Sequence, residues 1–112
     1  MNESNVIVVD RIISDNLLYK IIDEIPSLVI LYSEWSTTYQ IMKRKYKKME
    51  SEFGNRIKFY YMSNRCCPEI RAEYGIMFFP ACLFFREYKI IDIIEGAVST
   101  TTLHNKLNKL VI

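Results

Sequence analysis

Side chains that are capable of nucleophilic or redox chemistry gather at two places in this sequence. Cys66 and Cys67 are adjacent, and a third cysteine, Cys82, lies in the apolar stretch ACLFF. Hydroxyl side chains gather in Ser33–Gln40 (SEWSTTYQ), a segment that also holds the chain's only tryptophan. A thiolate can attack a disulfide or bind a metal, whereas a serine hydroxyl needs a neighbouring base before it becomes a nucleophile. The two places therefore suggest different chemistries, and each also has a purely structural interpretation.

The adjacent cysteines suggest a redox-sensitive or metal-binding pair. Neighbouring Cα atoms lie ~3.8 Å apart, below the ~4.4 Å lower end for relaxed disulfides, so a bond between Cys66 and Cys67 would be strained and easily reduced. Cys82 lies among large apolar residues, which favours a core position. Three cysteines and one histidine without a Cys-x-x-Cys pair do not form the usual ligand pattern of zinc. We therefore expect no metal and no cofactor, and Cys66 and Cys67 remain candidate redox thiols.

Ser36 has no base close to it in the sequence. The only histidine, His104, falls in the last predicted helix, and no Ser-His-acid arrangement is indicated. Ser36 stands where a long helix is predicted to begin. Serine is a favoured residue there, because its side-chain oxygen accepts a backbone N–H of the first turn. We therefore expect Ser36 to cap the helix.

The composition is typical of one globular domain, and we expect a single domain over residues 1–112. Fifteen basic and 13 acidic side chains give a net charge of +2, which produces no general attraction to nucleic acid or to an anionic membrane. No apolar run approaches the ~20 residues of a membrane span. The N-terminal MNESNVIVVD lacks the features of a secretory signal, and the odd cysteine count does not suit a disulfide framework. These features predict a cytoplasmic protein that needs neither nucleic acid nor membrane as a partner.

Apolar periodicity predicts five strands and four helices. The strands are expected at 5–9, 28–32, 57–62, 81–86 and 89–94, and the helices at about 15–25, 37–53, 68–74 and 100–111. Met42, Tyr46, Met49 and Phe53 form one stripe of the long helix, and Leu28–Tyr32 (LVILY) is apolar throughout, as in a strand buried on both faces. The order β-α-β-α-β-α-β-β-α predicts an α/β fold whose mixed central sheet has helices on both faces.

Three segments, in this order, resemble the thioredoxin family over almost the whole chain. Leu28–Gln40 (LVILYSEWSTTYQ) is similar to the family's buried strand, tryptophan and active-site helix start. Ala72–Pro80 (AEYGIMFFP) resembles the segment that leads to a cis-proline, and Glu95–Leu103 (EGAVSTTTL) resembles the Gly-Ala step before the last helix. The resemblance implies the thioredoxin fold and a cis bond between Phe79 and Pro80.

The same resemblance places Ser36 and Tyr39 at the positions of the family's two redox-active cysteines, with Thr37 and Thr38 between them. Ile30 stands where the family carries a buried aspartate that assists proton movement. Dithiol exchange needs an attacking thiolate and a second thiol to resolve the mixed disulfide. We therefore expect no dithiol–disulfide reductase activity at this position.

The resemblance still implies a surface for a partner. In the family, the residue before the cis-proline offers backbone hydrogen bonds to an extended peptide, a mode of recognition that needs no thiol. We expect a non-catalytic module that binds a protein or peptide through Trp35, Phe79 and Pro80. A role in cell redox homeostasis is implied by the family alone.

Two other functions stay open. One is a thiol–disulfide oxidoreductase or redox sensor that uses Cys66, Cys67 or Cys82. The other is glutathione binding at the cis-proline, but related folds that do this usually carry an additional helical domain, which 112 residues cannot hold. The basic residues of 43–48 are interpreted as a solvated helix face, with a contact surface for an acidic protein as the alternative.

Overall fold

The computed structural model describes residues 6–9, 25–66 and 68–112, and these residues contain a five-stranded mixed sheet. The strands are β1 (Val6–Val9), β2 (Ser27–Tyr32), β3 (Lys58–Ser63), β4 (Ala81–Arg86) and β5 (Lys89–Glu95). Their order across the sheet is β1-β3-β2-β4-β5. The first three run parallel, β4 runs antiparallel to β2, and β5 runs antiparallel to β4. This is the thioredoxin fold that the sequence predicts.

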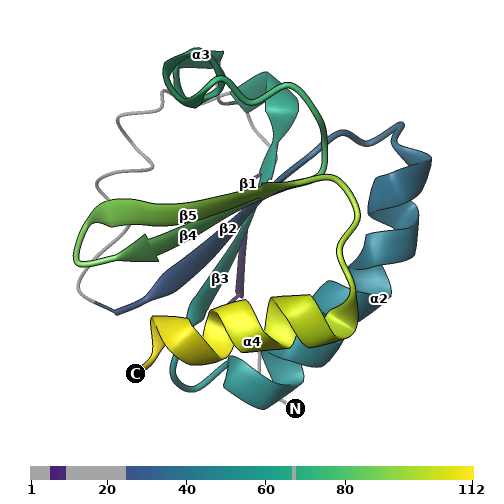
Figure 1. The fold of residues 1–112 in the computed structure, drawn as a ribbon. Coiled ribbons are helices and arrows are strands. Elements are labelled where there is room, and N and C mark those ends of the chain that lie inside the picture. The colour runs from purple at the N-terminus through teal and green to yellow at the C-terminus, as the bar shows by residue number, and fades with distance from the viewer. Residues whose placement is uncertain (1–5, 10–24, 67) are drawn as a thin grey trace.

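Helices lie on both faces of the sheet (Figure 1). They are α2 (Thr37–Phe53), the short 3-10 helix η1 (Asn64–Cys66), α3 (Pro68–Tyr74) and α4 (Thr100–Leu110). α2 and α4 pack on one face, and α3 contributes Ile70 to the core on the other. None of the described helices is long and apolar enough to cross a membrane.

The predicted first helix falls mostly on residues 10–24, which lie outside the described part of the chain. Its expected last apolar residue, Ile25, lies in a bend, and its side chain is 43% exposed. The prediction that Ile25 lies on a buried helix face is therefore wrong. Pro26 follows directly and disfavours helical backbone at the residue before it, which explains the difference.

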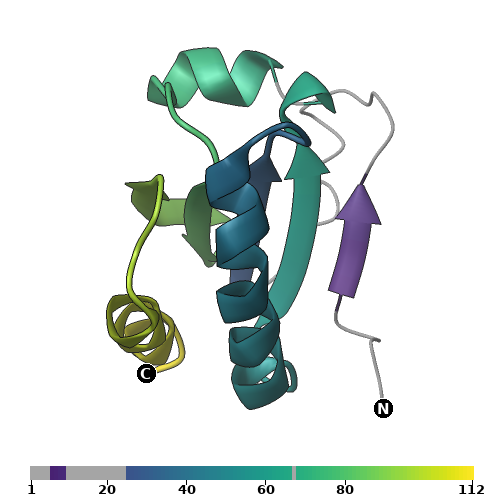
Figure 2. The ribbon, with the colours of Figure 1, turned by 90° about the vertical axis from the view of Figure 1, so that its right-hand side faces the viewer.

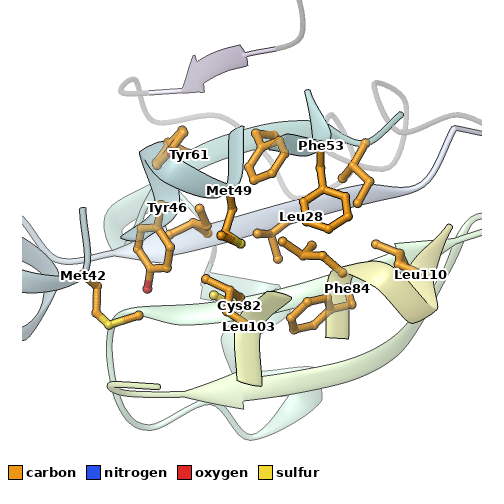
Figure 3. Packing of buried hydrophobic residues seen from close by; sticks show 14 of the residues in the cluster. Leu28, Met42, Tyr46, Met49, Phe53, Tyr61, Cys82, Phe84, Leu103 and Leu110 are labelled. Carbon is orange, nitrogen blue, oxygen red and sulfur yellow. The ribbon is translucent and has the colours of Figure 1, made fainter. Parts of the chain in front are cut away.

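β2 is the centre of the sheet and is buried on both faces, as its unbroken apolar sequence predicts. Leu28 and Ile30 point into the core beneath α2 and α4, whereas Val29 and Leu31 point into the core on the α3 face. All four side chains are fully buried. Figure 3 shows the first of these cores, in which side chains from α2, α4 and β4 surround Leu28. Fixing β2 in this way also fixes the position of the loop that follows it.

α2 contributes one stripe of side chains to this core. Its buried residues are Tyr39, Met42, Tyr46, Met49 and Phe53, which recur at spacings of three or four. The last four are the stripe that the sequence predicts, and the prediction is confirmed. The helix therefore lies on the sheet with a fixed rotation, and its N-terminus points to the carboxyl end of β2 (Figure 2).

The last helix, predicted at about 100–111, is α4 (Thr100–Leu110). Ser99 caps α4, and its Oγ accepts the Thr102 N–H at 3.0 Å. Leu103, Leu107 and Leu110 are buried against the sheet. Both the beginning and the buried face of α4 were thus readable from local sequence.

The hairpin between β4 and β5 turns through two residues with unusual backbone geometry. Glu87 and Tyr88 have φ values of 53° and 68°. Two consecutive residues with positive φ are typical of a type I′ turn, in which Asn-Gly is strongly preferred. Side chains with a Cβ are disfavoured there by about 1–2 kcal/mol per residue.

We therefore expect Glu87→Asn/Tyr88→Gly to raise the free energy of unfolding by about 1 kcal/mol, measured by urea denaturation. Gly96→Ala is the matched control, because Gly96 has a φ of +82° and an added Cβ would meet no atom within 4 Å. Only the backbone penalty applies there, so this variant should lose about 1 kcal/mol. A double variant that is no more stable than the wild type would contradict the type I′ interpretation.

Candidate functional site

Two loops meet at the carboxyl end of β2, the place where open α/β sheets tend to bind ligands. Leu31, near the end of β2, pairs with Ala81, the first residue of β4. Pro80 therefore lies next to the loop of residues 33–36 that joins β2 to α2. The register of the sheet brings together the two segments that the sequence analysis singled out.

Ser36 caps α2, as predicted. Its φ and ψ are −79° and 121°, its Oγ accepts the Tyr39 N–H at 3.1 Å, and its own N–H donates to the Ser33 carbonyl at 3.0 Å. His104 contacts Glu52 with its Nε2 at 3.3 Å, near the opposite end of α2. The helical rise puts that end about 24 Å from Ser36. Histidine therefore cannot serve as a base for this hydroxyl, whose role is structural.

Tyr39 lies on the inner side of α2 and not at the surface. It is 8% exposed, and its ring stacks on that of Tyr32, with the centroids 4.7 Å apart and 16° between the planes. Burial raises the pKa of the Tyr39 phenol to about 12, with smaller contributions from Tyr32 and Glu50. The position therefore holds a neutral packing residue at physiological pH.

Trp35 projects into the solvent from the loop before α2. Its side chain is 92% exposed. The loop itself is held by the Ser36 backbone bond and by an ion pair between Glu34 and Arg65, at 3.1 Å from Oε1 to the guanidinium. The fold therefore displays this tryptophan on a fixed loop without using it in the core.

The loop before β4 contains the Phe79–Pro80 peptide bond, which is cis. Pro80 is buried and Phe79 is half-buried, with the Arg71 guanidinium 5.3 Å from the centroid of its ring. Met77 and Phe78, which the sequence analysis did not select, are 76% and 66% exposed. The apolar side chains offered to the solvent beside the cis-proline are thus mainly those of Met77 and Phe78.

Glu95, the last residue of β5, holds this loop in position. Its Oε1 accepts the backbone N–H groups of both Met77 and Phe78, each at 2.8 Å. The Gly96 N–H donates to the Pro80 carbonyl at 2.7 Å. Sequence reasoning missed Glu95 as a site residue. Its only signal was its place before the Gly-Ala step, which does not reveal a bond to a distant loop.

Cys82 lies in the core, as predicted, and is 1% exposed. Burial raises the pKa of its thiol to about 12, and the Tyr46 hydroxyl beside it opposes this shift only in part (Figure 3). Such a thiol carries almost no thiolate at neutral pH and is poorly suited to attack a disulfide. Cys66 is the last residue of η1, and Cys67 lies outside the described residues. Among the residues that the structure describes, no group of three or more His, Cys, Asp or Glu side chains could hold a metal.

The comparisons with known proteins agree on one family. The model of the thioredoxin family matches residues 8–109. The thioredoxin of Porphyra purpurea is 29% identical over 87 residues, which are 78% of this chain and 81% of that protein. Thioredoxin 1 of Synechococcus elongatus is 26% identical over 85 residues, 76% of this chain and 79% of that protein.

A solved structure supports the fold. The thioredoxin Mala s 13 of Malassezia sympodialis superposes with a TM-score of 0.78 at 19% identity, over 93% of this chain and 91% of that one. At this identity the likeness concerns the fold and its topology.

The core beneath the site contains a buried thiol and buried phenols, so the free energy of unfolding at high pH tests whether these groups are shielded from water. The pKa values of Cys82, Tyr39, Tyr46 and Tyr61 are all raised, chiefly by burial. In the unfolded chain the thiol loses its proton at about pH 9 and the phenols at about pH 10. The unfolded state therefore binds fewer protons at high pH, and the free energy of unfolding should fall above about pH 9.

For Cys82 alone we expect a loss of about 1.4 kcal/mol per pH unit between about pH 9 and 12, measured by urea denaturation under reducing conditions. Cys82→Ala removes the thiol and leaves the phenols, so its decline should begin about one pH unit later. A decline from about pH 9 that is the same in both proteins would show that Cys82 is not shielded in the native state.

Proposed function

This chain belongs to the thioredoxin family, and we propose that it is a member without the redox-active dithiol that binds an extended protein segment. The observation that carries the proposal is the exposure of Trp35, Met77 and Phe78 on the two loops that meet beside Pro80. We call these three residues, together with the Phe79 backbone, the Trp35 surface. Its partner is a protein or peptide with an extended apolar segment.

The first support is the absence of thiol chemistry at the start of α2. The resemblance assigns the two cysteine positions to Ser36 and Tyr39, of which one caps the helix and the other packs inward. The aspartate position is taken by Ile30, which is fully buried. A hydroxyl in a cap and a buried phenol supply neither an attacking nor a resolving thiol.

The second support is the energetics of the Trp35 surface. Exposed side chains of this size contribute little to the stability of the fold. Clustered exposed apolar groups commonly mark interaction sites. Tryptophan in particular is enriched among the residues that dominate binding energy. The binding of a partner would remove Trp35, Met77 and Phe78 from water.

The third support is the backbone beside the cis-proline. Among the described residues, the Phe79 N–H and C=O make no backbone hydrogen bond. An extended peptide can pair with such groups by strand addition, which provides affinity without a thiol. The Glu95 bonds to Met77 and Phe78 hold this backbone in place before the partner arrives, which lowers the entropy lost on binding.

The alternative function is a thiol–disulfide oxidoreductase or redox sensor, and it is favoured by the similarity to proteins that are themselves thioredoxins. The burial of Cys82 disfavours that residue for such a role. The alternative therefore rests on Cys66 and Cys67. The two experiments below separate it from the proposal.

We expect the purified protein not to accelerate the reduction of insulin disulfides by dithiothreitol, followed by turbidity, above a control without protein. The reason is the missing pair of thiols at Ser36 and Tyr39. A thioredoxin with an intact Cys-x-x-Cys motif serves as the positive control. Turnover comparable to that control, lost in Cys66→Ser/Cys67→Ser, would establish the alternative in place of the proposal.

Peptides selected from a random phage-displayed library against the immobilised protein should bind through the Trp35 surface. We expect Trp35→Ala to weaken the binding of a selected synthetic peptide by about thirtyfold, about 2 kcal/mol, because it truncates a central aromatic anchor. Isothermal titration calorimetry gives the dissociation constants. N-methylation of the peptide backbone at alternate residues should abolish binding if strand addition contributes.

The matched control is Tyr88→Asn, which removes another exposed aromatic side chain, 56% exposed, at the distant hairpin and keeps a residue that tolerates positive φ. It should leave affinity unchanged, as should Cys66→Ser/Cys67→Ser/Cys82→Ala. The proposal fails if Tyr88→Asn weakens binding as much as Trp35→Ala. It also fails if the cysteine-free protein stays folded by circular dichroism and loses binding.

A further inference from the structure

A cavity of about 370 Å³ is lined by residues of α2, of β3 and of the carboxyl end of β2 with the loop that follows it. Its lining includes Tyr61 of β3, and β3 and β4 flank β2 on opposite sides. α2 lies along the sheet here (Figure 2). The volume falls in the range of cavities that enclose small molecules, ~300–1,000 Å³. This cavity is therefore distinct from the Trp35 surface in both position and lining.

Three tyrosines form the apolar walls. Tyr32 and Tyr39 stack face to face with centroids 4.7 Å apart, and the Tyr61 hydroxyl donates to the Glu50 carboxylate. Tyr32, Tyr39 and Tyr61 are at most 8% exposed, so the core fixes their ring positions. Burial raises the pKa of Tyr39 to about 12 and also raises that of Tyr61, so both phenols are neutral at physiological pH. The walls are rigid, flat and uncharged.

Two ammonium groups lie against these walls. Lys43 and Lys47 are four residues apart on α2 and line the cavity together. The Lys43 Nζ is 5.7 Å from the centroid of the Tyr39 ring, and the Lys47 Nζ is 5.4 Å from that of the Tyr61 ring. Like charges at this spacing on a helix repel each other. An anion between them would relieve the repulsion.

The charges around the cavity do not cancel. Glu34, which also lines it, is paired with Arg65 at 3.1 Å, and Lys47 is 3.7 Å from a Glu50 carboxylate oxygen. Within the described part of the chain, Lys43 has no carboxylate within 4.0 Å. The balance around the cavity is therefore positive, and Lys43 is the cation available to a ligand.

We propose that this cavity binds a small aromatic anion. The ring of the ligand lies against Tyr32 and Tyr39, and its carboxylate or phosphate lies between Lys43 and Lys47. The Gln40 amide at the edge of the cavity can donate to the same anionic group or accept from a ring substituent. The chemistry that selects the ligand is the pairing of a flat apolar body with one negative end.

The probes for this proposal are benzoate and phenyl phosphate, titrated into the ¹⁵N-labelled protein and followed by amide chemical shifts. We expect saturable shifts in residues 39–47 and at Tyr61, with dissociation constants in the millimolar range that suits fragments of this size. Lys43→Gln should weaken binding about fivefold, the value of one partly exposed charge contact, and Lys43→Arg should restore most of it.

Lys48→Gln is the matched control, because it removes the same charge from an exposed position of α2 that does not line the cavity. It should leave both dissociation constants unchanged. Cyclohexanecarboxylate tests the need for a flat ring, and benzylamine tests the need for a negative charge; both should bind at least about fivefold more weakly than benzoate.

Three results would overturn the proposal. One is equal weakening by Lys48→Gln and Lys43→Gln, which would show general attraction to a basic helix. Another is equal binding of inorganic phosphate and phenyl phosphate, which would remove the aromatic part. The last is an absence of saturable shifts around the cavity with either probe.

Discussion

The complete burial of β2 is the constraint on which the rest of this structure depends. A strand in the middle of a sheet with helices on both faces must be apolar at every position, and residues 28–31 meet that requirement. The strand cannot slip by one residue, because a slip would exchange the side chains of its two faces. Its register with β3 and β4 therefore determines where the chain leaves the sheet. The end of β2 therefore sets the positions of the loop of residues 33–36, the start of α2 and the cis-proline loop.

The core side chains beneath the N-terminus of α2 pack against one another and are not arranged to transfer protons. Ile30 faces Cys82 across the β2–β4 pair, and the Tyr39 and Tyr46 rings lie over this part of the sheet. Every ionisable group among these is held in its neutral form by burial, as the raised pKa values of the thiol and of the phenols indicate. Ile30 supplies no carboxylate with which a thiolate placed at Ser36 could exchange a proton. The core and the helix cap are thus both consistent with the non-catalytic role proposed above.

Much of this architecture could be predicted because it is encoded by neighbouring residues. The LVILY run indicates a central strand, the spacing of Met42, Tyr46, Met49 and Phe53 indicates one helix face, and Ser36 and Ser99 are caps with local partners. Ile25 was misplaced because its periodicity suits a helix, while Pro26 prevents helical backbone there. The Glu95 bonds to Met77 and Phe78 and the cavity beneath Lys43 could not be predicted. They join residues from different elements, and only the folded sheet brings those elements together.

The Trp35 surface and the cavity lined by Tyr32, Tyr39 and Tyr61 both depend on the loop that follows β2. Glu34 lines the cavity, and Trp35, the next residue in the same loop, projects into the solvent. Both residues belong to the loop of residues 33–36. This loop is closed by the hydrogen bond from the Ser36 N–H to the Ser33 carbonyl, and the Glu34–Arg65 ion pair links it to η1. On the far side, Glu95 gives the cis-proline loop a similar tie. A loop that is already ordered loses little entropy when a partner binds, so a small apolar surface can reach useful affinity. The bonds that order these two loops are therefore bonds that would favour the recognition role proposed above.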